Sequence, residues 1–290
     1  YTENLLMSDD AVGTPLLEEQ AVEQTEDGRE LEVQLDYMRP LGEALRMEAG
    51  FNSEMEWMAN RFYSESLDLT ANTTRPDVNL NNTFAYDEQV HAAYGILGGE
   101  LGPFGAQVGV RVEQVYTTFD LTTTGEAFDN SYFSAYPSAF LTYAPAEGRK
   151  MRLSYSKRVR RPNTWQLNPF GDSDNPTAGR AGNPSLDPKS THAFEVSSAP
   201  IAGGYTLQLA PYYRRTVDAI SWSQRLTDDG VTLTTFENFA TENSYGAEVI
   251  GTLNMDRSLR ARGSFNPYQR DTDGSTVNRA PSRRALGQPR

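Results

Sequence analysis

Residues 30–37 read ELEVQLDY and place an apolar side chain at every second position. Leu31, Val33 and Leu35 alternate with acidic or amide side chains, and Tyr37 continues the apolar set. Successive side chains of a β-strand point to opposite faces of the sheet. The pattern therefore predicts a strand with one apolar and one polar face.

The same period of two recurs along most of the chain, in about a dozen segments of about ten residues. We expect an all-β protein built from antiparallel strands, with a short turn between residues 51 and 55. The clearest further segments are residues 45–51, 55–59, 90–96, 106–112, 151–155, 205–209, 245–253 and 259–265.

The expected connections are of two kinds. Short turns contain Gly, Pro, Asn or Asp, whereas long connections are rich in polar residues. Short turns on one side and long loops on the other are typical of a transmembrane β-barrel, which has a polar lumen and an apolar belt. The 15 tyrosines and 13 phenylalanines suit its aromatic girdles. The short turns are residues 39–42, 98–105, 145–148, 201–204 and 254–257, and the long loops are residues 64–87, 117–130 and 162–190.

Composition excludes several other classes of protein. The formal net charge of -13 disfavours binding to nucleic acid. A mean hydropathy of -0.60, without an apolar run of about 18 to 20 residues, excludes a helical membrane protein. The absence of cysteine removes disulfides, thiol nucleophiles and thiolate metal sites. His91 and His192 are the two histidines, so a histidine-based catalytic or metal site requires both to converge.

A large water-soluble β-sandwich or solenoid is the alternative fold, since its strands also alternate. In such a protein the apolar face is buried against another sheet, and long loops seldom gather on one side. The asymmetry of the connections therefore favours the barrel.

The most distinctive stretch is residues 153–170, LSYSKRVRRPNTWQLNPF, followed by residues 182–195, GNPSLDPKSTHAFE. These motifs resemble the outer-membrane β-barrel of the TonB-dependent receptor superfamily, in the outer membrane protein β-barrel family. The resemblance covers about residues 28–275. It extends in order to residues 36–53, 86–94, 109–113, 136–143 and 243–248.

Two arginines in the first motif are candidate lumen residues. Arg158 and Arg160 alternate with Val159, so we expect both to project into the lumen, as a pair balanced by lumenal carboxylates. Direct contact with a ligand is the alternative role. Arg161 and Pro162 are expected to end the strand, because proline cannot continue the ladder of hydrogen bonds.

The residues after this strand are predicted to form a loop that packs onto the barrel mouth. Trp165 and Phe170 are expected to pack there, with stacking on a substrate as the alternative. Two rigid turns are expected, the first formed by Asn168, Pro169 and Phe170, and the second by Gly182, Asn183 and Pro184.

Two acidic stretches suggest binding sites but have simpler explanations. Asp172, Asp174 and Asn175 carry oxygen ligands that suit calcium, yet the spacing lacks the Gly and terminal Glu of an EF-hand loop. A solvated loop is favoured there, and no metal or cofactor is expected. Residues 18–32 are interpreted as one acidic extracellular loop. We divide the chain into a loop-like acidic segment (1–27), a barrel region (28–275) and a polar, basic tail (276–290).

Membership of this superfamily implies an N-terminal plug domain and a short box that contacts the energy-coupling protein TonB. Neither is recognisable in these 290 residues. Barrels of this superfamily have about 22 strands. We therefore expect the chain to be a middle portion of a receptor, truncated at both ends.

The leading hypothesis is a transport role in the bacterial outer membrane. The chain would form part of the barrel of a TonB-dependent importer for a scarce nutrient such as a metal chelate, a glycan or a peptide. Its partners would be outer-membrane lipid, the TonB complex and the nutrient, and no enzymatic chemistry is expected. The alternatives are a passive outer-membrane pore and a soluble β-rich glycan-binding or adhesin module.

Overall fold

The computed structural model describes residues 2–4, 18–68, 73–76, 81–170, 172–175, 178–198, 201–202, 205–226, 230, 232–255 and 259–274. Within them, 16 strands form a single sheet and one short helix, α1 (Thr164–Leu167), lies in a loop. The strands are β1 (Thr2–Asn4), β2 (Glu18–Leu41), β3 (Leu45–Asp68), β4 (Thr73–Pro76), β5 (Asn82–Leu101), β6 (Phe104–Leu121), β7 (Glu126–Ala146), β8 (Arg149–Arg160), β9 (Asp172–Asn175), β10 (Ala178–Arg180), β11 (Lys189–Ser198), β12 (Ile201–Ala202), β13 (Tyr205–Leu226), β14 (Thr232–Met255), β15 (Leu259–Phe265) and β16 (Tyr268–Gly274).

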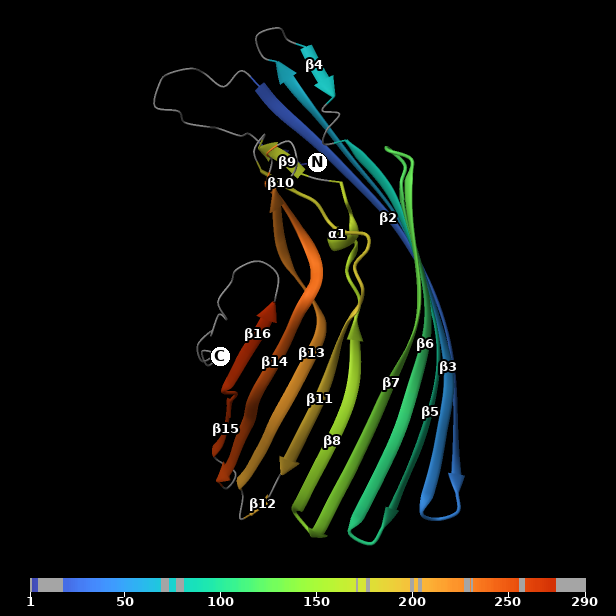
Figure 1. Cartoon of the computed structure of the whole chain (residues 1–290). Helices are drawn as coiled ribbons and strands as arrows, with labels where there is room; N and C mark the ends of the chain where they lie inside the picture. The colour runs from blue at the N-terminus through green and yellow to red at the C-terminus, as the bar shows by residue number, and fades with distance from the viewer. Residues whose placement is uncertain are drawn as a thin grey trace.

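The sheet is a curved, open wall rather than a closed barrel (Figure 1). Its strands follow the order β1-β2-β3-β5-β6-β7-β8-β11-β13-β14-β10-β9, with β15 and β16 also paired to β14. The long strands pair antiparallel with their neighbours, whereas β10 runs parallel to β14. The prediction of an all-β, antiparallel, partial barrel is confirmed.

Tight turns gather at one end of the wall, and the helix α1 with β4, β9 and β10 lies toward the other (Figure 1). Gly42, Gly102 and Gly148 occupy three of the tight turns with φ of 76°, 58° and 72°. Residues with a Cβ seldom adopt this left-handed backbone, which explains glycine at these positions. In an outer-membrane barrel the short turns face the periplasm, so the opposite end is the extracellular mouth.

Four predicted loops or turns are wrong in whole or in part, because strands continue through them. In the loop expected at residues 64–87, β3 continues to Asp68 and β5 begins at Asn82. β3 runs from residue 45 to 68 without a turn near residue 52. β2 begins at Glu18, so residues 18–32, expected as an acidic loop, form part of a strand paired with β3. β6 and β7 extend to residues 121 and 126, and only residues 122–125 turn. Strand segments that extend beyond the membrane are polar and therefore resemble loops in composition. Their backbone N–H and C=O groups nevertheless pair with the neighbouring strand.

One strand also carries its apolar set on the unexpected face. Val90 and Ala92 are 3% and 2% exposed and pair with Val115 and Glu113 on the inner side of the wall. Leu97, by contrast, is exposed and pairs with Val108 on the outer side. Both faces of β5 are partly apolar, so only the register against β6 decides which faces lipid.

No helix among the described residues is long and apolar enough to cross a membrane.

Candidate functional site

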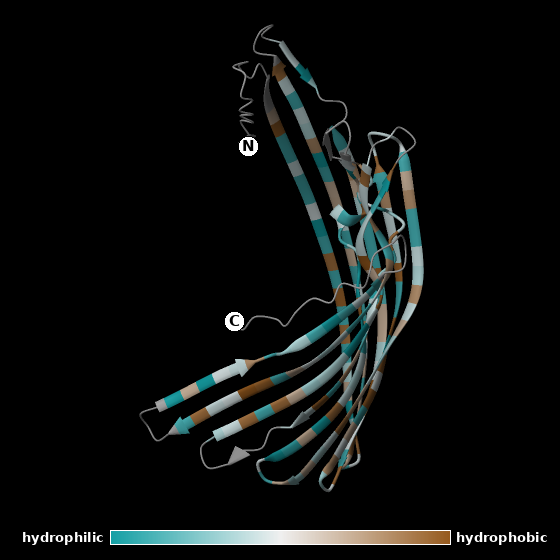
Figure 2. Cartoon of the chain, turned by 60° about the vertical axis from the view of Figure 1, so that its left-hand side comes forward, coloured by the Kyte–Doolittle hydropathy of each residue, from teal (hydrophilic) through white to brown (hydrophobic). Residues whose placement is uncertain are grey.

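The outer face of the wall carries a continuous band of exposed aliphatic side chains. Residues directly opposite each other on paired strands share a face. Along β7, β8 and β11, Leu141 pairs with Leu153, which pairs with Val196, and all three are exposed. Figure 2 shows the alternation of hydrophobic and hydrophilic residues along the strands. Such a band is what lipid contact requires.

Aromatic rings border this band at both ends. Toward the mouth, the ring of Phe194 lies 4.8 Å from that of Tyr155 and 6.2 Å from that of Tyr213. Toward the periplasm, the rings of Phe104 and Tyr143 stack at 4.9 Å. Phe104 and Tyr116, both on the outer face of β6, are separated by about 40 Å of strand, which at a tilt of about 45° spans about 28 Å of membrane. That height matches an outer-membrane apolar belt.

The segment between β8 and β11 folds back onto the inner face at the extracellular mouth, and we call residues 161–188 the mouth loop. Its helix α1 begins with a capping box. The side chain of Asn163 accepts a hydrogen bond from the Gln166 amide, and the Gln166 side chain accepts one from the Asn163 amide, both at 3.1 Å. This reciprocal pair satisfies two amides that a helix start leaves unpaired.

Asn168 joins the two predicted turns of the mouth loop. Its side chain accepts a hydrogen bond from the amide of Phe170 at 3.0 Å, and its carbonyl accepts one from the amide of Gly182 at 2.7 Å. A Cβ on Gly182 would lie 2.5 Å from the carbonyl oxygen of Asn168 and 2.6 Å from that of Gln166. Only glycine allows this close approach of the two halves of the loop.

Asn183 and Asn238 tie the mouth loop to the wall. The side chain of Asn183 donates to the carbonyl of Phe236 on β14 at 2.9 Å. Asn238, also on β14, donates to the carbonyl of Asp187 and accepts from its amide, both at 2.8 Å. These hydrogen bonds hold the loop in register with the outer end of β14.

Apolar packing completes the attachment of the loop. Leu167 and Leu186, from its two halves, are 7% and 2% exposed and enter one buried cluster with side chains of the wall. The cluster lies on the inner face of β5, β6 and β14. Its other members are Phe84, Tyr86, Phe119, Leu121 and Phe236.

Trp165 lies on the loop beside this cluster. Its ring makes an edge-to-face contact with Phe236 at 4.8 Å and lies 6.0 Å from the ring of Trp222 on β13. Pro162 and Pro184 line a 20 Å³ cavity under the loop, together with Tyr86 and Tyr132. Pro169 and Phe170 are half-buried at the loop's first turn.

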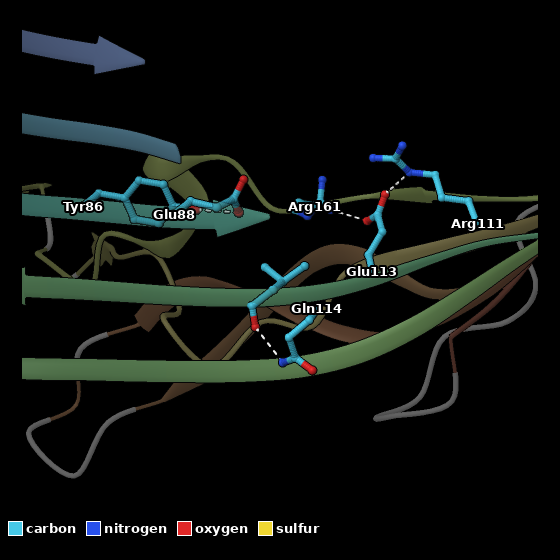
Figure 3. A network of polar contacts seen from close by, with 7 residues as sticks. Tyr86, Glu88, Arg111, Glu113, Gln114 and Arg161 are labelled. Carbon is cyan, nitrogen blue, oxygen red and sulfur yellow. Dashed lines mark hydrogen bonds and ion pairs between the residues drawn. The ribbon is translucent and has the colours of Figure 1, made fainter. Parts of the chain in front are cut away.

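Arg161 is the arginine of the first motif that forms ion pairs. It lies just after β8, and its Nη2 is 2.5 Å from Oε2 of Glu113, whose Oε1 is 2.6 Å from Nε of Arg111 (Figure 3). Burial opposes the charged form of Arg161, yet Tyr132, Glu113 and Glu88 raise the pKa of its guanidinium above the ordinary value. Glu113 is 5% exposed, so its carboxylate is held away from water.

Arg158 and Arg160 differ from the expectation of a pair balanced by carboxylates. Both lie on the face of β8 that Ser154 and Ser156 share, and both are exposed. Among the described residues, neither forms an ion pair, whereas Arg161 pairs with Glu113.

The two histidines do not converge. Nδ1 of His91 lies 2.9 Å from the Ser53 hydroxyl, and Nδ1 of His192 lies 3.0 Å from the Tyr155 hydroxyl. The part of the chain that the structure describes contains no group of three or more His, Asp or Glu arranged to hold a metal ion. Asp172, Asp174 and Asn175, predicted to lie in a solvated loop, lie instead in the short strand β9.

Sequence reasoning did not single out Glu113, Phe236 or Asn238. Glu113 follows the valine-rich segment of β6. Its carboxylate lies on the face opposite the valines, and this position was a signal that the side chain points inward. Phe236 and Asn238 lie in a stretch of mixed composition, and their role depends on contacts with a loop more than 50 residues earlier. Alternation alone contains no information about such contacts.

Comparison with known proteins agrees with this architecture. Residues 3–285 match the family described as the outer membrane protein beta-barrel family. The chain belongs to this family. Its expected location in the outer membrane is thereby confirmed. No curated protein matches the chain.

Solved structures share the fold of this family member at low sequence identity. The copper transporter OprC is 11% identical with a TM-score of 0.64, and the match covers 86% of this chain and 41% of OprC. The ferric citrate transporter FecA, in its unliganded form, is 10% identical with a TM-score of 0.57, over 91% of this chain and 42% of FecA. The ferric yersiniabactin uptake receptor FyuA from Yersinia pestis is 15% identical with a TM-score of 0.53, over 89% of this chain and 37% of FyuA.

The chain therefore spans less than half the length of these solved structures. The predicted resemblance to barrels of TonB-dependent receptors is confirmed at the level of the fold.

Proposed function

We propose that this chain forms part of the wall and mouth of a TonB-dependent outer-membrane importer for a scarce nutrient. The observation that carries the proposal is the mouth loop, which is packed and hydrogen-bonded against the inner face at the extracellular end. A loop held in this way narrows the mouth and presents a defined surface to a nutrient.

The barrel fold shared with the copper, ferric citrate and ferric yersiniabactin proteins supports the same proposal. The nutrient would contact the mouth from outside, and TonB would act through a plug domain to open the passage. No step requires covalent chemistry. The work of this chain is binding, exclusion and guidance of the nutrient.

Growth tests distinguish an importer from a passive pore. A strain lacking this gene and a strain lacking TonB are compared on limiting metal chelates, glycans and peptides. We expect both strains to lose growth on the same nutrient. Loss of growth in the gene deletion alone, with normal growth in the strain lacking TonB, would overturn the proposal in favour of a passive pore.

Membrane insertion is a separate requirement of the proposal. We expect the protein to fractionate with the outer membrane and to migrate faster on gels when it is not heated, as folded barrels do. A soluble product whose mobility does not change on heating would contradict the proposal and support the soluble binding module.

A further inference from the structure

Three cations lie together on the inner face, at the base of the mouth loop. Arg160, the last residue of β8, pairs directly with Lys189, the first residue of β11. Arg158 lies two residues before Arg160 and therefore on the same face. Like charges directly opposite each other on paired strands destabilise a sheet. The arrangement therefore calls for a negative group that neutralises it.

The described residues do not supply that negative group. None of the three cations forms an ion pair within them, although Arg46, Arg111 and Arg161 each pair with a glutamate. Glu195 and Glu242 occupy the same face, but strand spacing places their Cα atoms about 14 Å from that of Arg158. Asp187 and Asp218 are nearer, two residues before Lys189 and next to it on β13, yet neither forms an ion pair with it. Within the described part of a chain whose net charge is -13, these three adjacent cations thus have no ion-pair partner.

Hydroxyl groups lie beside these cations. Thr191 is directly opposite Arg158, and its Oγ1 is 2.9 Å from Oγ1 of Thr216 on the next strand. Arg158 and Arg160 are exposed, so a solute in the lumen can reach their guanidinium groups. Guanidinium and ammonium groups beside hydroxyls are the donors that bind carboxylate and phosphate oxygens.

We propose that Arg158, Arg160 and Lys189 form a binding site for a small anion that carries two or more carboxylate or phosphate groups. The planar guanidinium of each arginine binds such a group through two parallel hydrogen bonds, and Lys189 adds a point charge. The inference deepens the proposed function and rests on it, because the bound anion is then the imported nutrient or the charged part of it.

Binding is measured by calorimetric titration of the full chain, purified in detergent, at low ionic strength. The probes are citrate, pyrophosphate and uncharged glycerol in separate titrations. We expect citrate or pyrophosphate to bind and glycerol not to bind. Binding of citrate alone identifies a carboxylate site, and binding of pyrophosphate alone identifies a phosphate site.

The decisive variant is Arg158→Gln/Arg160→Gln, with Arg149→Gln as its matched control. Arg149 is an exposed arginine at the opposite, periplasmic end of the same strand. We expect the double variant to bind the anion at least about tenfold more weakly, because two charge-assisted contacts are lost. Arg149→Gln is expected to bind as the unmodified chain does. Failure of both citrate and pyrophosphate to bind, or equal weakening of binding in the control, would overturn the proposal.

Further variants keep the test independent of folding. If the double variant loses its heat-modifiable mobility, Lys189→Gln is tested in its place. We expect this variant to lose anion binding, and unchanged binding would contradict the site. Arg158→Lys/Arg160→Lys keeps the charges and is expected to restore part of the affinity. Anion binding without TonB-dependent growth would contradict the import function but not the anion site. TonB-dependent growth without anion binding would contradict the anion site alone.

Discussion

The inner face of β6 is built in two ways along one strand. Toward the mouth, Phe119 and Leu121 are 3% and 2% exposed in the cluster that includes Leu167 and Leu186 of the mouth loop, and Val115 on the same face is fully buried. Toward the periplasm, the same face carries Gly105 and Gln107, outside the buried cluster. The difference shows that the loop, rather than the strand, creates the core at the mouth. Apolar side chains are stabilised only where the loop removes water.

Replacement of Phe119 by alanine is expected to have the largest effect on this comparison. The substitution leaves a cavity among Phe84, Leu167 and their neighbours, and should lower the free energy of unfolding by about 4 kcal/mol. Chemical denaturation in detergent micelles measures the change. Gln107→Ala, on the periplasmic half of the same face, is the control and should change the value by less than about 0.5 kcal/mol. Equal effects would mean that the two halves do not differ.

Glu113→Ala is expected to rank second, because it separates the mouth loop from β6. Without its carboxylate, the guanidinium of Arg161 remains charged and enclosed with no ion-pair partner. The expected loss is about 3 kcal/mol in the free energy of unfolding, from the same denaturation measurement. Glu195→Ala, which removes a carboxylate of the inner face with no ion pair in the described residues, is the control. A loss no greater than that of the control would show that the ion pairs contribute nothing.

Gly182→Ala tests the close approach within the loop and is expected to rank third. The added Cβ meets two backbone carbonyls, so the two halves of the loop must separate. We expect a loss of about 2 kcal/mol. Faster cleavage of the loop by an added protease is the second measurement. Gly95→Ala, where a Cβ meets nothing within 4 Å, should be neutral, and a neutral Gly182→Ala would contradict the loop's packing.

Asn163→Ala is the substitution with the smallest expected effect on the mouth loop. It removes the cap of α1 and leaves the amide of Gln166 without its side-chain acceptor. A typical cap contributes about 1 kcal/mol. We expect a decrease of that size and a modest increase in proteolysis of the loop, with Asn163→Ser expected to restore most of the stability. An unchanged rate of cleavage would show that the capping box does not hold the loop.

Strand positions and faces were largely predictable, because alternation over residues 30–37 and 106–112 shows which face of the strand is apolar and faces lipid. β5 was the exception, since Val90 and Leu97 offer apolar groups to opposite faces and only pairing with β6 separates them. The motif residues Asn168, Gly182 and Asn183 lie in the mouth loop, outside the strands. Their partners were not predicted, because the contacts with Phe236 and Asn238 join segments more than 50 residues apart.

The arginines illustrate the same limit on a smaller scale. Arg158, Arg160 and Arg161 are nearly adjacent in sequence, and nothing in their spacing marks one as ion-paired. The end of β8 at Arg160 frees the backbone, so that Arg161 reaches Glu113 while the other two remain on the strand.

By itself, the sequence determined the β-strand architecture, the lipid-facing band and the family, because these depend on local alternation and short motifs. Tertiary structure alone decided which face of β5 meets lipid, which arginine is neutralised and how the mouth loop is anchored. These features depend on register and on contacts between distant segments. A one-residue shift in register exchanges the two faces of a strand, and local composition does not specify that choice.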